Sequence, residues 1–245
     1  MLIGKEITRL KRQKRKKILV YGLLMLFILS ISGAAWAAPG NTNSSEQNNN
    51  ETQPVSLFKD VTAEDGNLIY INYLAKREII SGFSDGGFHP ADGLTRAEAA
   101  TVLVKAAGLS QTSENKAVFK DVSAGHWAAG SIAAAAEAGY LKGYPDGTYH
   151  PEEKLTRAQG ISLILRLSKQ KDTGVELPEL KDLDSKNWAA RSVAIGLAAG
   201  MVGLTKDKSQ FLPDANFSRG DLSRALAVLL TTDPDLSRTA LNGSL

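Results

Sequence analysis

The chain has 245 residues, of which 43% are apolar and 22% charged, a composition typical of a globular protein. It has no cysteine, and its three histidines have none of the spacings of a zinc site, so we expect no metal and no cofactor. The formal net charge is +3, but residues 1–37 hold eight Lys or Arg and one acid, which leaves 21 basic and 25 acidic residues, a net of −4, in the rest. That balance excludes the basic footprint of a nucleic-acid binder.

Residues 1–37 have the three parts of a secretory signal peptide. A basic block from Lys5 to Lys17 precedes an apolar run from Ile18 to Ser32 and the sequence Ala35-Trp36-Ala37, which matches a cleavage site. An uncleaved anchor is the alternative, because no charged residue occurs between Lys17 and Glu46. Both interpretations place residues 38–245 outside the cytoplasm, and the membrane is a partner only in the second.

Residues 38–56 are rich in Asn, Ser and Thr and are interpreted as a flexible linker. Beyond them three sequence blocks recur in one order at offsets of 61 or 62 residues, which predicts three copies of one unit. The blocks are Phe-Lys-Asp-Val at 58–61, 119–122 and (with Leu at both ends) 180–183; an Asp-Gly turn at 82–90 and 143–151, degraded at 204–213; and Leu-Thr-Arg-Ala-Glu at 94–98, with variants at 155–159 and 217–221.

Each copy contains two amphipathic helical patterns, so an all-α fold is predicted. A two-helix unit cannot bury its apolar face alone, and three copies sharing one core is the expected solution. The repeats are placed at 57–117, 118–178 and 179–232, with a tail at 233–245. The first helix of each repeat is predicted at 66–77, 127–138 and 188–199, and the second at 95–107, 156–168 and 218–230.

The second helix of each repeat is predicted to begin with a capping box, in which the N-cap hydroxyl and the side chain three residues later satisfy each other's backbone amides. The expected pairs are Thr95 with Glu98, Thr156 with Gln159 and Ser218 with Asp221.

Capping does not explain the arginine that follows the cap in all three copies, Arg96, Arg157 and Arg219. A cation is mildly unfavourable at a helix N-terminus, so the repetition indicates a function. A guanidinium beside unpaired helix amides would form a carboxylate receptor. The alternative is a salt bridge to an Asp of a neighbouring repeat.

Trp127 and Trp188 share one position at the start of the first helix, where repeat 1 has Gly66. The two interpretations are a core side chain and a wall that stacks on a sugar ring. Asp60, Asp121 and Asp182 are interpreted as residues that cap or brace the turn before the first helix.

The ordered blocks resemble the S-layer homology (SLH) domain family over residues 58–231. The resemblance implies three helix–loop–helix repeats in a pseudo-threefold helical bundle with grooves between the repeats. It also implies non-covalent binding of secondary cell-wall polysaccharide, commonly one that carries ketal-linked pyruvate, by a secreted cell-wall or S-layer protein. By motif position the carbohydrate-binding residues are Arg96, Arg157, Arg219, Trp127 and Trp188.

Repeat 3 departs from the pattern, because Leu204 and Lys208 replace two turn glycines and Gly220 follows Arg219. A groove built mainly from repeat 3 is therefore in doubt, and the groove of Arg157 with its neighbouring Trp is expected to be the strongest.

The leading hypothesis for function is an anchor that binds an anionic wall glycan. A membrane-tethered adaptor between membrane and wall is the alternative if the signal is uncleaved. A glycan hydrolase is disfavoured, because glycosidases need two carboxyl groups flanking the bond and Glu98 of repeat 1 is Gln159 in repeat 2.

Overall fold

A computed structural model describes residues 55–111, 118–168 and 174–233. These ranges contain six helices and no strands, which confirms the all-α prediction for them, and none of the helices is long and apolar enough to cross a membrane. The predicted signal peptide, nearly all of the predicted linker and residues 234–245 of the tail lie outside the described ranges. The helices are α2 (Leu68–Ala75), α3 (Arg96–Ala106), α4 (Ala129–Glu137), α5 (Arg157–Leu165), α6 (Ala190–Ala198) and α7 (Arg219–Thr232). The first and last residues of each helix lie within three residues of the predicted bounds.

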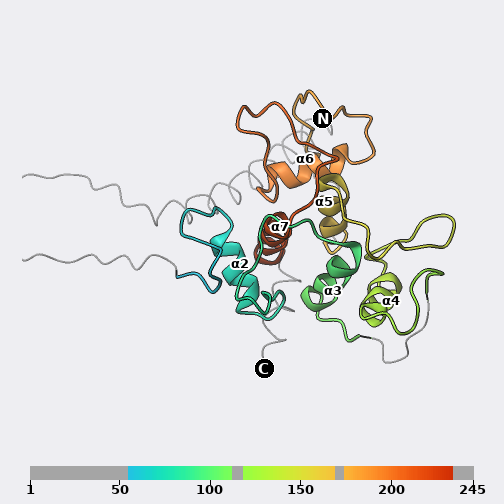
Figure 1. The fold of residues 1–245 in the computed structure, drawn as a ribbon. Helices are drawn as coiled ribbons and strands as arrows, with labels where there is room; N and C mark the ends of the chain where they lie inside the picture. Colours follow the sequence, from blue (N-terminus) through green and yellow to red (C-terminus); the bar gives the residue numbers. More distant parts are fainter. Residues whose placement is uncertain (1–54, 112–117, 169–173, 234–245) are drawn as a thin grey trace, which may run out of the picture. The chain divides into compact units, whose positions relative to one another are not determined.

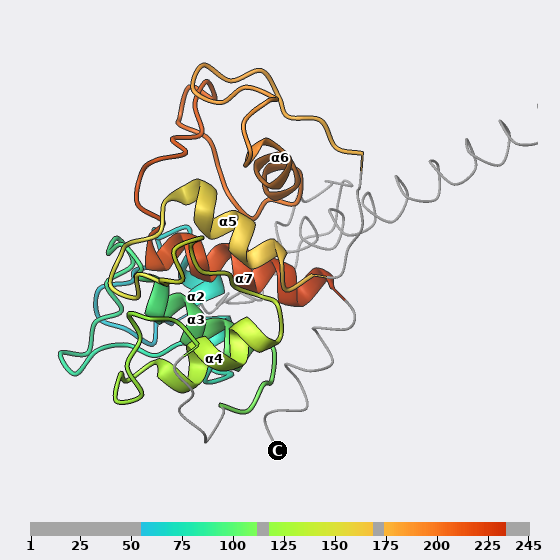
Figure 2. The ribbon, with the colours of Figure 1, turned by 90° about the vertical axis from the view of Figure 1, so that its right-hand side faces the viewer.

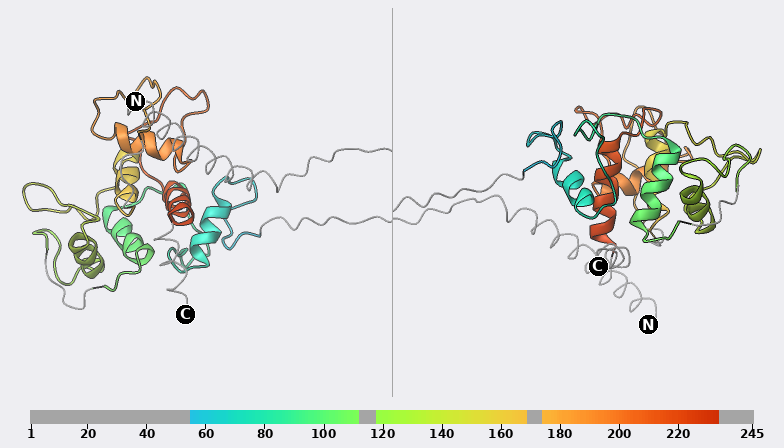
Figure 3. Two further views of the ribbon diagram at one scale, coloured as in Figure 1. Left: turned by 180° about the vertical axis from the view of Figure 1, so that it is seen from behind. Right: turned by 60° about the horizontal axis from the view of Figure 1, so that its bottom comes forward.

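The second helices of the repeats form the middle of the domain, and the first helices lie outside them (Figure 1). α4 packs against α3, α6 against α5 and α2 against α7, so each second helix is covered by the first helix of the next repeat in the cycle. α5 and α7 also contact each other, and Figure 2 shows them side by side. Figure 3 shows the same inner and outer helices from behind and from below. The inner helices supply fully buried residues such as Leu103, Ile161 and Leu226.

The first two amides of every inner helix donate to carbonyls of the next repeat. Arg96 N donates to Glu153 O at 2.9 Å, and the corresponding bonds are Arg157 N to Ala215 O at 2.8 Å and Arg219 N to Asp92 O at 2.9 Å. The following amides donate to Pro151 O, Pro213 O and Pro90 O. Helix N-terminal amides have no partner within their own helix, so these bonds join repeat 1 to 2, 2 to 3 and 3 to 1. The cycle of contacts is closed, while pseudo-threefold geometry stays a prediction.

The third amide of each inner helix is satisfied by the capping box. The hydroxyls of Thr95, Thr156 and Ser218 accept from the backbone N–H groups of Glu98, Gln159 and Asp221, whose side chains accept from the cap amides in return. Three different side chains at the third position thus form the same local structure.

The repeated aspartates hold a different turn from the one predicted. Asp60 accepts from the amides of Phe88 and His89, both at 2.7 Å, so it braces the segment that enters the second helix, not the turn before the first. Asp121 and Asp182 accept the equivalent pairs of amides in repeats 2 and 3. The second residue of each pair has a positive φ, of 56° at His89, which turns two successive N–H groups toward one carboxylate.

The turn before each first helix is capped by residues that the sequence analysis missed. Asp65 Oδ1, His126 Nδ1 and Asn187 Oδ1 each accept from the amide two residues later, at 2.8 to 3.1 Å. Their side chains differ chemically, so a search for an identical residue does not find them. What they share is a hydrogen-bond acceptor at a fixed offset of 61 residues.

Repeat 3 compensates for a glycine that it lacks. A Cβ on Gly82 would lie 2.5 Å from Cε1 of Phe58, and one on Gly143 would lie 2.4 Å from Cε1 of Phe119. Repeat 3 has Leu180 in place of the phenylalanine and Leu204 in place of the glycine, and both leucines pack against the core. Leu180 is smaller than phenylalanine and leaves room for Leu204, which is larger than glycine, so one change compensates for the other.

The end of α2 predicts a stabilising substitution. Glu78 has φ of 57°, where repeats 2 and 3 have Gly139 and Gly200 at φ of 76° and 72°. Left-handed backbone costs a residue with a Cβ about 1 kcal/mol. We expect Glu78→Gly to raise the free energy of unfolding by about 1 kcal/mol and Tm by about 2–4 °C, measured by thermal and urea unfolding. Gly139→Ala is the reverse control, and a Glu78→Gly variant of lower Tm would contradict the argument.

Acid should weaken the turns held by Asp60 and Asp121. Burial raises the pKa of each carboxyl, but the two backbone amides and the neighbouring histidine outweigh it and hold the pKa below its ordinary value. A depressed folded-state pKa stabilises the fold above the unfolded pKa of about 4 and loses this contribution as pH falls through the folded value. We expect the free energy of unfolding in urea to decline below about pH 4, and less steeply in Asp60→Asn/Asp121→Asn.

Glu137→Gln is the matched control for that pair, because Glu137 is exposed and accepts no hydrogen bond within the described residues. An unchanged acid slope in the aspartate variant would show that these carboxyls do not link folding to pH.

Candidate functional site

The arginine at the start of each inner helix joins two repeats. Arg96 Nε donates to Tyr149 O at 2.6 Å and its Nη2 to Lys142 O at 3.3 Å. Arg157 makes the same bonds to Phe211 O and Gly203 O, and Arg219 to Phe88 O and Ser81 O. Each guanidinium also lies 4.4 to 4.9 Å from the centroid of the buried ring it bonds beside. These bonds to two carbonyls of the next repeat are a structural role that the sequence analysis did not predict.

The expected receptor of guanidinium plus unpaired helix amides is not formed. The first two amides of each inner helix donate to the next repeat and the third donates to the cap residue. An anion at this site would be bound by the remaining guanidinium N–H groups and by side chains. A guanidinium has five N–H groups, so two structural bonds leave donors to spare.

The three arginines differ in their third contact. Arg157 Nη1 donates to Asp221 Oδ1 at 2.9 Å, and the two side chains are only 15% and 25% exposed. Nη1 of Arg96 and of Arg219 donates no hydrogen bond to any described residue. The alternative of a salt bridge to a neighbouring Asp thus holds for Arg157 and for neither of the others among the described residues.

Burial and nearby acids act in opposite directions on Arg219. Burial lowers the pKa of its guanidinium, and the charges of Glu98, Asp92 and Asp60 partly offset the effect. The cation therefore lies among carboxylates without being bonded to one of them.

Both tryptophans are on the surface. Trp127 is 63% exposed and Trp188 is 66% exposed, so the interpretation as core side chains is wrong. A large exposed aromatic ring at the same place in two repeats is available for a binding partner.

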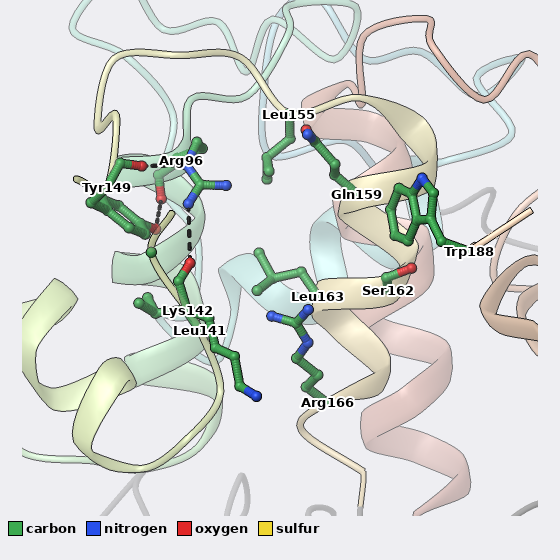
Figure 4. Close-up of a pocket in the computed structure, with 11 residues that line it drawn as sticks. Arg96, Leu141, Lys142, Tyr149, Leu155, Gln159, Ser162, Leu163, Arg166 and Trp188 are labelled. Carbon is green, nitrogen blue, oxygen red and sulfur yellow. Dashed lines mark hydrogen bonds between the residues drawn. The ribbon is translucent and has the colours of Figure 1, made fainter. Parts of the chain in front are cut away.

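Trp188 lies with Arg96 in one pocket of about 170 Å³ (Figure 4). Figure 4 shows the guanidinium groups of Arg96 and Arg166 on two sides of this space and Trp188 on a third. The lining residues come from all three repeats: Arg96 from repeat 1; Leu141, Lys142, Gly143, Tyr149, Leu155, Gln159, Ser162, Leu163 and Arg166 from repeat 2; and Trp188 from repeat 3. We name this pocket the Arg96 groove.

The prediction that Arg157 and its neighbouring Trp form the strongest groove is wrong. Trp188 belongs to the Arg96 groove, and Arg157 is bonded to Asp221. By the repeat offsets, the residue equivalent to Trp188 is Gly66 for Arg157 and Trp127 for Arg219, and we expect each to face that arginine. The sequence analysis placed the arginines and tryptophans correctly at the starts of their helices. It could not show that an arginine and a tryptophan two repeats apart line the same pocket.

The Arg96 groove is electrostatically positive. Arg96, Lys142 and Arg166 line it, and none of its lining residues is acidic. Burial raises the pKa of Tyr149 to about 12, so its hydroxyl stays neutral and donates to Arg96 O at 2.8 Å. The lining thus favours an anion.

One polar atom in this groove has no partner. Ser162 Oγ is buried and makes no hydrogen bond to any described residue, although Ser162 lines the groove beside Trp188. A buried hydroxyl without a partner costs free energy.

The described ranges hold no group of three or more His, Asp or Glu side chains that could bind a metal ion.

The S-layer homology domain family matches residues 57–100 and 118–159. The chain carries S-layer homology domains. The two matched ranges lie in repeats 1 and 2, and the assignment of residues 179–232 as a third SLH repeat stays a prediction, supported by the capping box and arginine contacts of α7.

Three relatives share this region. The chain is 33% identical over 144 residues to a cellulosome-anchoring protein of Acetivibrio thermocellus, covering 57% of this chain and 32% of that protein. It is 36% identical over 154 residues to an S-layer protein of Bacillus thuringiensis subsp. finitimus, covering 62% and 19%. It is 33% identical over 157 residues to an endoglucanase of Bacillus sp. (strain KSM-635), covering 64% and 16%. The chain thus spans a third or less of each relative, and the SLH repeats and surface relatives support a secreted, cell-wall or cell-surface location.

The exposure of the tryptophans predicts that they add little to folding. We expect Trp127→Ala and Trp188→Ala each to change the free energy of unfolding by less than about 0.5 kcal/mol, as is usual for surface positions. Phe217→Ala, at a fully buried ring, should cost about 3–5 kcal/mol in the same urea titration. If a tryptophan variant lost as much free energy of unfolding as Phe217→Ala, the indole would have to be a core side chain.

Proposed function

We propose that the described domain anchors the protein to the bacterial cell wall by binding an acidic secondary wall polysaccharide in the Arg96 groove. The observation that carries the proposal is the joining of Arg96, Lys142, Arg166 and Trp188 around one pocket that has no acidic lining residue. The SLH family and its anchoring and S-layer relatives support the same role.

The lining suits a sugar with a carboxylate substituent. Nη1 of Arg96 has no hydrogen-bond partner among the described residues and would bind the carboxylate. The exposed indole of Trp188 would stack on the apolar face of the ring. A pyruvate ketal presents both a carboxylate and a ring face, so pyruvylated glycan is the ligand class that we propose.

A second groove would strengthen attachment. Arg219 keeps Nη1 without a partner in the described ranges, and Trp127 holds the position equivalent to Trp188. Two modest sites on one polymer with many repeats raise the overall affinity through effective concentration. Specific recognition is required, because the chain beyond residue 37 has a net charge of −4 and does not attract polyanions in general.

We propose no catalytic activity for the described domain. A glycosidase needs two carboxyl groups on either side of the scissile bond, and the Arg96 groove has none in its lining. If the N-terminal segment is retained, the same wall binding would make the protein an adaptor between membrane and wall.

The first experiment is co-sedimentation of residues 38–245 with purified wall sacculi. Three arms use untreated wall, wall stripped of its non-peptidoglycan polymer, and wall with the pyruvate removed by mild acid. We expect binding to the first arm and its loss in the other two. Equal binding to all three would exclude the acidic glycan as the ligand.

The groove itself is tested by Trp188→Ala and Arg166→Gln. Both should weaken binding to untreated wall about tenfold or more, because each removes a direct contact, and thermal unfolding should show that the fold is kept. Lys76→Gln is the matched charge control, at an exposed lysine where α2 ends. Arg96 is avoided, because its replacement would also break the bonds to repeat 2. Binding that survives both groove variants would place the ligand elsewhere.

A further inference from the structure

The third residue of each inner helix lies near or acts on the arginine of the preceding repeat. Gln159 caps α5 and lines the Arg96 groove. Asp221 caps α7 and bonds Arg157 of repeat 2. Glu98 caps α3, and its charge acts on Arg219 of repeat 3. One position therefore presents a neutral amide, a bonded carboxylate and a nearby carboxylate to three otherwise equivalent arginines.

At Arg157 the anion position is already filled. Asp221 Oδ1 accepts from Nη1 at 2.9 Å while Oδ2 accepts from the backbone N–H of Ser218 at 3.2 Å. Nη1 is the group that Arg96 and Arg219 leave without a partner in the described ranges. A carboxylate held by its own helix is present at high effective concentration, so a ligand carboxylate would have to displace it.

By the repeat offsets, the positions equivalent to the Arg96 groove lie beside Arg157 and beside Arg219, and we name them the Arg157 groove and the Arg219 groove. The aromatic residue is missing from the Arg157 groove. Gly66 stands where the other repeats have tryptophan, and a Cβ built on it meets nothing within 4 Å. A Cβ on Gly220 would lie 2.9 Å from Asn67 Nδ2, which places the segment after Gly66 against the start of α7. Position 66 is therefore open to a larger side chain, and by the repeat offsets we expect that side chain to lie beside Arg157 and Asp221.

We propose that the third residue of the inner helix sets whether each groove binds an acidic sugar, and that Asp221 closes the Arg157 groove as an internal carboxylate. This inference rests on the proposed function and ranks the three grooves. The Arg96 groove, with Gln159, binds the anion most tightly. The Arg219 groove, with Glu98, binds it less tightly, and the Arg157 groove does not bind it.

The ranking follows from charge at constant local structure. All three side chains complete a capping box, so they are equivalent for the helix. They differ in the charge that an incoming carboxylate meets. Gln159 adds none, whereas Glu98 and Asp221 each add a negative charge that repels the ligand, and Asp221 in addition occupies the donor.

Reciprocal substitutions test the proposal. Gln159→Asp gives the Arg96 groove the aspartate that repeat 3 has at this position. The double variant Asp221→Gln with Gly66→Trp gives the Arg157 groove the glutamine of repeat 2 and the tryptophan of repeats 2 and 3. Each new residue already serves that position in another repeat, so capping is kept. The probe is purified wall polysaccharide immobilised on a sensor surface, with residues 38–245 as the analyte and thermal unfolding as the check of folding.

We expect Gln159→Asp to weaken binding about tenfold, and the double variant to strengthen it at least about threefold by adding a site. Gln159→Glu, which copies repeat 1, should fall between the wild type and Gln159→Asp and covers the case in which the aspartate variant does not fold. Unchanged affinity in the Gln159 variants, or no gain in the double variant, would overturn the inference. A wild-type protein that does not bind the polysaccharide at all would instead overturn the proposed function.

Discussion

The N-terminus of the inner helix is the point on which the structure of this domain depends. The first two backbone amides of this helix donate to carbonyls of the next repeat. Two side-chain donors of its first residue, the arginine, do the same. Helix amides need such acceptors because they have none within the helix. Since the same bonds occur in α3, α5 and α7, each repeat is completed by its neighbour and the last by the first.

The same geometry explains why an arginine occupies a position where a cation is mildly unfavourable. A guanidinium can bond two carbonyls of the next repeat, stack on its buried ring and still have donors left. A lysine has its three donors on a single nitrogen and lacks the planar fork that reaches two separate carbonyls while lying against a ring. The residue is therefore structural in every repeat, and its remaining donors are the ones that we propose for a ligand. Among the residues of the capping box, the repeats differ in charge at the third helical position, which is Glu98, Gln159 or Asp221.

The sequence predicted the local features well because they depend on neighbours within a few residues. All six helices and the three capping boxes follow from apolar spacing and from a hydroxyl three residues before an acceptor. The partners of Asp60 lie 28 and 29 residues away and were misplaced for that reason. The acceptors before the first helices, Asp65, His126 and Asn187, were missed because they share a function without sharing a residue type.

The amino-acid sequence alone determined the repeat, the helices, the caps and the identity of the arginines and tryptophans, since each is written in a short stretch of chain. Only the tertiary structure decided which of them meet. The Arg96 groove takes its arginine from repeat 1, its floor from repeat 2 and its tryptophan from repeat 3, so no spacing within one repeat could reveal it. Burial and pairing at such a junction depend on how the helices pack in three dimensions, which is why Arg157 is bonded internally while Arg96 faces a pocket.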